Sequence, residues 1–202
     1  MRGARSGVSA PRAWQRMLSG RRLDLLDPSP LDVELEDIAH GLARVARWNG
    51  QTTGGHVFSV AQHSLLVEAI AAAFEPGLAG PARLSIVLHD APEYVIGDLI
   101  TPLKAVIGDG YVAAEARLLR AIRLRFGLPA EPGPDLARLT KRADRAAARL
   151  EAVRLAGFSA EEADCTFGPP EPIRAELEGL IRPWPTEEAS LRYRDRVAAL
   201  VR

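Results

Sequence analysis

The sequence predicts an all-α protein whose helices form one domain. Apolar residues recur at helical spacing along most of the chain, and clusters of proline and glycine separate these stretches. No stretch shows convincing alternation of apolar and polar residues, as a half-buried strand would. The chain has 202 residues, of which 47% are hydrophobic, and this is enough for one core. Residues 17–202 are assigned to the domain, and residues 1–16, rich in arginine, glycine and serine, are expected to form a flexible tail.

The expected helices follow one another along the whole domain. Apolar spacing and the breaks between segments predict helices over residues 34–47, 57–74, 81–90, 111–126, 135–156, 169–182 and 186–201. Ser159 and Glu162 form a candidate capping box between two of them. The arginines of residues 136–156 are interleaved with leucine and alanine at core spacing, which favours a half-buried helix over an RNA-binding arm.

Composition excludes several classes of protein. Basic and acidic residues both number 26, so no global positive field favours a nucleic-acid polymer as partner. No stretch approaches the roughly 20 apolar residues of a membrane span, and the start of the chain lacks the apolar region of a secretory signal. The single cysteine, Cys165, excludes an internal disulfide and a cysteine-rich zinc site, and it is expected to be a small buried residue. A cytoplasmic protein is therefore expected.

Polar residues with metal-binding chemistry follow the apolar run of residues 84–88. His89 and Asp90 are adjacent, and Glu93 comes three residues after the aspartate. Burying such groups without a partner is costly, and imidazole and carboxylate both bind divalent metals. A histidine beside a capping or ion-paired aspartate is the alternative explanation for this stretch.

Two residues elsewhere in the chain favour the metal explanation. His63 lies inside the helix expected over residues 57–74, and Asp144 lies in the middle of a later helix. Aspartate is unfavourable in a helix interior, so Asp144 requires either an ion pair with a nearby lysine or arginine or a metal. Together with His63, His89 and Asp90, it is interpreted as a metal ligand.

The order of these residues resembles the HD-domain metal-dependent phosphohydrolases. The match spans residues 31–151 and includes further motifs, namely Arg47-Trp48, His63-Ser64-Leu65, His89-Asp90-Ala91-Pro92-Glu93, Gly97-Asp98 and Thr101-Pro102-Leu103-Lys104. Two branches of the family show this order. They are the 5′-deoxynucleotidases, which cut deoxynucleoside monophosphates, and the phage-type dATP triphosphohydrolases, which remove the whole triphosphate. Residues 157–202, where the C-terminal helices are expected, carry no motif of the family.

The resemblance implies an HD-domain helical bundle in which His63, His89, Asp90 and Asp144 hold a divalent cation. It implies that Glu93 acts as a general base or orients the attacking water, in agreement with its position in the sequence.

The resemblance also assigns Asp98 a second catalytic role, although a turn residue after Gly97 explains it equally well from spacing alone. It places Arg47 and Trp48 on the nucleotide and Lys104 on a phosphate. A core aromatic residue at a helix end is the alternative for Trp48.

These expectations define a metal-dependent phosphohydrolase that attacks the α-phosphorus of a deoxynucleoside mono- or triphosphate. Zinc, manganese, cobalt, iron and nickel all suit two histidines and two carboxylates, and magnesium suits the phosphates of a triphosphate. Related enzymes assemble as dimers or larger homo-oligomers, so the same is expected here. The alternatives are an HD-type hydrolase of another signalling or cyclic nucleotide and a non-catalytic metal-binding helical protein. His40 is expected to be half-buried on its helix, and His56 is assigned no ligand role.

Overall fold

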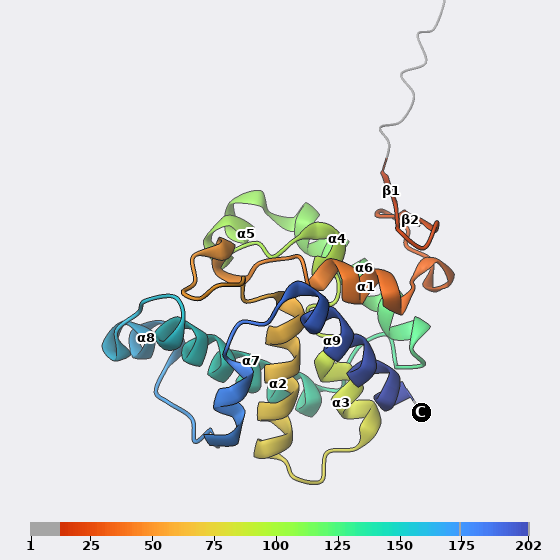
Figure 1. Cartoon of the computed structure of the whole chain (residues 1–202). Helices are drawn as coiled ribbons and strands as arrows, with labels where there is room; N and C mark the ends of the chain where they lie inside the picture. The colour runs from red at the N-terminus through yellow and green to blue at the C-terminus, as the bar shows by residue number, and fades with distance from the viewer. Residues whose placement is uncertain (1–12, 174, 202) are drawn as a thin grey trace, which may run out of the picture.

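The computed structural model describes residues 13–173 and 175–201, and it confirms the all-α class (Figure 1). Helix α2 (Val60–Phe74) lies at the centre of the bundle, where it packs against α7 (Pro134–Arg154), α3 (Gly80–Val87) and α9 (Thr186–Val201). The other elements are β1 (Trp14–Arg16), β2 (Arg22–Asp24), η1 (Pro30–Asp32), α1 (Leu35–Leu42), η2 (Arg47–Gly50), α4 (Glu93–Ile96), α5 (Thr101–Ile107), α6 (Asp109–Arg125), α8 (Ala160–Phe167) and η3 (Ala175–Leu180).

The central position of α2 follows from its sequence. The helix is apolar on nearly all sides, so it is stable only when neighbouring elements surround it. Leu65 faces one hydrophobic cluster, formed mainly with α1, α3 and α9, whereas Leu66 faces a second cluster formed with α7 and the chain around η3. The side chain of Ser59 caps the helix by accepting a hydrogen bond from the backbone N–H of Gln62. The polar residue His63 is thereby held in the interior of the bundle.

Several helix boundaries differ from those expected. The helix predicted over residues 34–47 ends at Leu42, and residues 47–50 form the separate turn η2. The helix predicted over residues 57–74 begins only at Val60, and the one predicted over 81–90 ends at Val87. Helices α6, α7 and α9 begin and end within two residues of the predicted bounds.

Two local predictions are wrong. Most of the segment 169–182 is irregular chain with the short 3₁₀ turn η3, because Pro169, Pro170 and Pro172 restrict the backbone and remove hydrogen-bond donors. The second error concerns the start of the domain, where no strand was predicted. A small antiparallel hairpin of β1 and β2 forms there, and the side chain of Leu23 in it is completely buried. Its first strand includes residues 14–16 of the expected flexible tail, whereas residues 1–12 of that tail lie outside the described residues.

The short helix α8 combines one confirmed prediction with one error. Ser159 and Glu162 form the expected capping box, with each side chain accepting a hydrogen bond from the other residue's backbone N–H. Cys165, however, is an exposed free cysteine, because the helix buries only Ala163. Within the described part of the chain, none of the helices combines the length and apolar character needed to cross a bilayer.

Candidate metal centre

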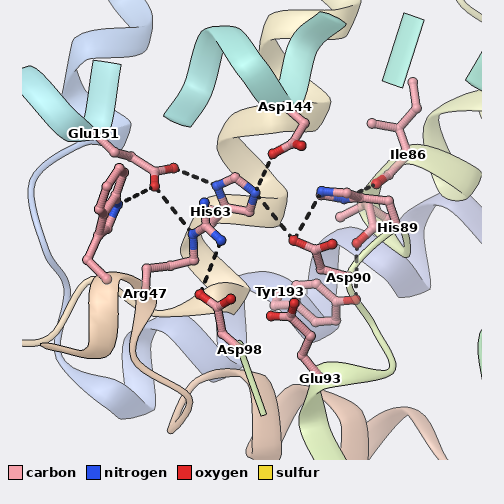
Figure 2. Close-up of polar contacts among 12 residues, drawn as sticks. Arg47, His63, Ile86, His89, Asp90, Glu93, Asp98, Asp144, Glu151 and Tyr193 are labelled. Atoms are coloured by element: carbon pink, nitrogen blue, oxygen red, sulfur yellow. Dashed lines mark hydrogen bonds and ion pairs between the residues drawn. The ribbon is translucent and has the colours of Figure 1, made fainter. Parts of the chain in front are cut away.

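Three separate elements bring four of the predicted residues together (Figure 2). His63 comes from α2, Asp144 comes from α7, and His89 and Asp90 lie in the turn between α3 and α4. The Nε2 atom of His63 lies 3.4 Å from Asp90 Oδ2 and 3.2 Å from Asp144 Oδ1. His89 Nε2 lies 3.2 Å from the same Asp90 oxygen, so both rings face one carboxylate.

The turn after α3 explains how two consecutive side chains reach one site. The helix ends at Val87, and Leu88 and Ala91 bury their side chains in the core. Tight backbone hydrogen bonds follow, from His89 N–H to Ile86 O at 3.1 Å and from Ala91 N–H to Leu88 O at 3.1 Å. These apolar anchors leave the neighbouring His89 and Asp90 side chains facing His63.

The hydrogen bonds of the two rings define which nitrogen of each neutral imidazole carries the proton and which has a lone pair available. His89 Nδ1 lies 2.9 Å from the carbonyl oxygen of Ile86, which can only accept, so Nδ1 carries the proton. His63 Nδ1 lies 2.5 Å from Glu151 Oε1. Burial raises the pKa of Glu151, but the positive charges of His63 and Arg47 outweigh burial and lower it to about 2. The ionised Glu151 can only accept a hydrogen bond, so Nδ1 of the neutral His63 ring also carries the proton, and each neutral ring presents a lone pair at Nε2.

Both Nε2 atoms are buried without a hydrogen-bond partner among the described residues, despite the nearby Asp90. Buried polar atoms are rarely left in this state unless an ion or water occupies the space. One ligand atom from each of His63, His89 and Asp90 lies within 4.8 Å of the others, so this group could hold a metal ion. Asp144 is not part of this group of three, but its Oδ1 atom lies 3.2 Å from His63 Nε2, so its carboxylate could supply a fourth ligand. Two imidazoles and two carboxylates fit a divalent ion such as zinc, manganese or iron.

Electrostatic interactions at this centre favour the charged forms of its histidines and aspartates. Burial and the charge of Arg47 lower the pKa of His63, but the three carboxylates around the ring together raise it well above 6.5. Burial also lowers the pKa of His89, but Asp90 and Asp144 together raise it above 6.5. Burial raises the pKa of Asp90 and Asp144, whereas the histidines lower both below the usual 3.8. Without a cation, protons on the histidines balance the carboxylates.

A cleft connects this centre with solvent. Its volume is about 270 Å³, and both His89 and Asp144 line it. The Asp144 side chain is 40% exposed, whereas that of His63 is fully buried. Lys141 and Arg123 also line the cleft, so an anion that enters it meets positive charge beside the metal-binding group.

Glu93 lies at the start of α4, below Asp90 in the view of Figure 2. The residue is only 3% exposed, and its Oε2 atom has no hydrogen-bond partner among the described residues. Burial, together with the negative charges of Asp90 and Asp98, raises the pKa of Glu93 to about 9. Its other oxygen lies 3.8 Å from Lys104 Nζ, so the predicted base and the predicted phosphate contact are neighbours.

The structure also shows the immediate partners of Asp98 and Lys104. Asp98 Oδ2 accepts a hydrogen bond of 3.1 Å from Nη1 of Arg47. Lys104 donates to Glu115 at 3.1 Å, and its ammonium lies 5.6 Å from the centre of the Tyr111 ring. Lys104 therefore lies beside Glu93, and Asp98 is close enough to raise the pKa of Glu93. Both residues are already ion-paired, Asp98 with Arg47 and Lys104 with Glu115.

Sequence reasoning missed Glu151, which contacts both the histidine and the predicted nucleotide-binding pair. Its Oε2 atom accepts hydrogen bonds from Arg47 Nε at 3.3 Å and from Trp48 Nε1 at 2.9 Å. One signal was available: Glu151 lies two turns after Asp144 on α7, so both residues face the same side of the helix. The Trp48 ring is half-buried and packs edge-on against Phe158 and Phe167.

The two remaining histidines lie outside the metal-capable group. His40 is half-buried on α1, as expected, and His56 is exposed in the loop before α2. Neither residue belongs to the set that could hold an ion among the described residues.

The fold and the donor set define a helical protein with a candidate centre for a divalent metal. No protein-family model matches the chain. An uncharacterized protein of Rhodobacter capsulatus is 58% identical to it over 187 residues, which cover 92% of this chain and 95% of the relative. The chain therefore belongs to the same protein family as this Rhodobacter capsulatus protein.

Proposed function

We propose that the protein is a metal-dependent nucleotide phosphohydrolase of the HD-domain type, acting on the α-phosphorus of deoxynucleotides. The observation that carries the proposal is the pair of buried Nε2 atoms of His63 and His89, which face Asp90 and Asp144 and have no hydrogen-bond partner among the described residues. A divalent ion bound there would lower the pKa of a water molecule and neutralise charge on a phosphoryl group.

Glu93 has the properties of the group that takes the proton from the attacking water. It is buried beside the centre, and Oε2 has no protein partner among the described residues, so this atom is available to a water molecule. Repulsion from Asp90 and Asp98 contributes to the raised pKa of Glu93. A cation beside Asp90 would offset this repulsion and shift the pKa towards the range of a general base.

Positive side chains on both sides of the centre suit a phosphate. Lys104 lies 3.8 Å from Glu93, close enough to contact a phosphate oxygen at the reacting position. Lys141 lines the cleft that reaches His89 and Asp144. Arg47 uses Nε and Nη1 to bind Glu151 and Asp98, so a role on the nucleotide requires its remaining amino group or an exchange of partners.

A monophosphate and a triphosphate present the same phosphorus to the centre, but they give different products. We would incubate metal-loaded protein with matched deoxynucleoside mono- and triphosphates and identify the product by ³¹P NMR. Inorganic phosphate from the monophosphate indicates a 5′-deoxynucleotidase, and intact triphosphate from the triphosphate indicates a triphosphohydrolase. Light scattering on the same preparation tests the proposed homodimer or larger homo-oligomer.

Two controls make this experiment decisive. Asp90→Asn removes the carboxylate shared by both histidines and should abolish the product, whereas Asp135→Asn alters an exposed carboxylate near the start of α7 and should not. Absence of any product with zinc, manganese, cobalt, iron or nickel would overturn the nucleotide assignment. Metal binding without hydrolysis would favour a non-catalytic metal-binding protein.

A further inference from the structure

One buried carboxylate connects the metal centre to the turn that carries Arg47 and Trp48. Glu151 Oε1 accepts the hydrogen bond from Nδ1 of His63, and Glu151 Oε2 accepts those from Arg47 and Trp48. The residue is fully buried, so water does not compete for these bonds. Arg47 extends the connection by donating to Asp98. The chain of contacts His63–Glu151–Arg47–Asp98 thus joins α2, α7, η2 and the segment after α4 (Figure 2).

The turn η2 depends on this connection because its backbone is unfavourable. Trp48 has φ 56° and Asn49 has φ 50°, both in the left-handed region that side chains other than glycine rarely adopt. The bond from the Trp48 indole to Glu151 holds this conformation together with the edge-on packing of Phe158 and Phe167. Residues held in strained conformations persist only where surrounding contacts define them, and they concentrate at functional sites.

We infer that Glu151 is a positioning residue that couples metal binding at His63 to the conformation of the turn Arg47–Gly50. The inference rests on the proposed metal centre, but it does not require that the protein hydrolyses a nucleotide. Glu151 keeps the proton of the neutral His63 ring on Nδ1 and therefore keeps Nε2 available to a metal ion. Because the other oxygen of the same carboxylate binds the turn, a metal ion bound at His63 Nε2 would be connected to Trp48 through two hydrogen bonds. Coupling of this kind acts equally in both directions.

Glu151→Gln separates the two functions of the carboxylate while preserving its shape. If the amide oxygen of glutamine faces His63, the amide N–H₂ faces the donors of Arg47 and Trp48, and the turn loses its acceptor. If the amide is flipped, N–H₂ faces Nδ1 of His63, and the proton moves to Nε2, where it blocks the metal. Either arrangement weakens the coupling, and we expect zinc affinity to fall by about 10- to 100-fold.

The matched control is Glu68→Gln. Glu68 is also a buried glutamate, it lies on α2 as His63 does, and it binds Arg83 and Arg196 rather than any residue of the metal centre. Both substitutions remove a buried negative charge from an ion-paired cluster and should lower stability. Only Glu151→Gln should change zinc affinity.

The coupling can be measured directly in the wild-type protein, which avoids any folding defect of a variant. Zinc is titrated into metal-free ¹⁵N-labelled protein, and the indole N–H signals of Trp14, Trp48 and Trp184 are followed by NMR, with the signal of Trp48 identified in a Trp48→Phe sample. We expect the Trp48 indole signal to shift as zinc saturates the site. The signals of Trp14, in the hairpin, and Trp184, in the core, should shift less.

The possible results separate this inference from the proposed activity. A shift of Trp48 with zinc, together with weaker zinc binding in Glu151→Gln than in Glu68→Gln, supports the positioning role whether or not a nucleotide is hydrolysed. Zinc binding that leaves the Trp48 signal unchanged overturns the coupling and leaves the metal centre intact. A wild-type protein that binds no zinc overturns both.

Discussion

Asp144 Oδ1 lies 3.2 Å from Nε2 of His63, which places an aspartate from the middle of α7 against a histidine from the first turn of α2. An ion pair with a nearby lysine or arginine, such as Lys141 or Arg145, was the other explanation for an aspartate at this position. Arg145 instead donates to the backbone oxygen of Phe167 at 2.7 Å. Among the residues that the structure describes, Asp144 forms no ion pair with a lysine or an arginine, so its position is explained by the contact with His63.

Replacement of Asp144 should weaken metal binding. In Asp144→Asn the side chain keeps its shape but loses its charge, and we expect zinc affinity to fall at least about tenfold, or about 1.4 kcal/mol. Isothermal titration calorimetry with zinc measures this change. The exposed Asp135 on the same helix provides the control Asp135→Asn, which should bind zinc like the wild type. Equal affinity in the two variants would exclude Asp144 as a ligand.

The metal-free and metal-loaded proteins should respond to pH in different ways. His63 and His89 have pKa values raised above 6.5, so their contribution to metal-free stability is complete below pH 6.5 and is lost as pH rises through the folded values. Asp90 and Asp144 have pKa values lowered below 3.8, so their contribution is present above pH 3.8 and is lost as pH falls. These groups therefore stabilise the metal-free protein most between these two values.

Above pH 6.5, the stabilisation of the protein by zinc should change with pH in the opposite direction to the contribution of the metal-free histidines. The imidazoles must release their protons to bind a metal, so affinity and the stabilisation by zinc both rise with pH. Calorimetric melting temperatures with zinc and with a chelator should diverge as pH rises from about 6 to about 8. A constant difference between the two curves would contradict binding through His63 and His89.

Glu93→Gln should separate metal binding from hydrolysis. The amide keeps the volume of Glu93 but cannot accept a proton from water, so kcat should fall by about 10²- to 10⁴-fold while zinc affinity stays unchanged. The product assay by ³¹P NMR and a zinc titration on the same sample measure both quantities. The exposed Glu131 gives the control Glu131→Gln, for which full activity is expected. Full activity in Glu93→Gln would remove this residue from the mechanism.

The close approach of α1 to α4 should be intolerant of added volume. A Cβ atom at Gly41 would lie 2.8 Å from the backbone oxygen and the Cβ atom of Tyr94, the residue after Glu93. Gly41→Ala should therefore destabilise the protein by about 1–3 kcal/mol and lower activity through displacement of Glu93. Chemical denaturation measures the first effect.

A second glycine substitution serves as the opposite control. Gly110 lies near the start of α6, and a Cβ atom there would meet nothing within 4 Å. Gly110→Ala should raise stability by about 0.5–1 kcal/mol because alanine favours the helix. Destabilisation by both substitutions would show that the contact with Tyr94 is not the cause.

The sequence pattern was sufficient to predict the all-α class and most of the central helices. The apolar spacing within α2, α6, α7 and α9 and the breaks after them are local properties, so no tertiary information was needed. The residues of the metal-capable group were recognisable for a similar reason. His89 and Asp90 are adjacent, and both come directly after an apolar run, where buried polar groups need a partner.

Tertiary structure decided the features that depend on contacts between distant parts of the chain. Glu151 is one glutamate among many in the sequence, and only the approach of α7 to α2 and η2 gives it His63, Arg47 and Trp48 as partners. The exposure of Cys165 likewise depends on which face of α8 meets α7. The spacing of residues along the chain limits which of them can share a face of a helix. Burial and hydrogen bonding with distant elements then determine which of these faces forms the metal centre.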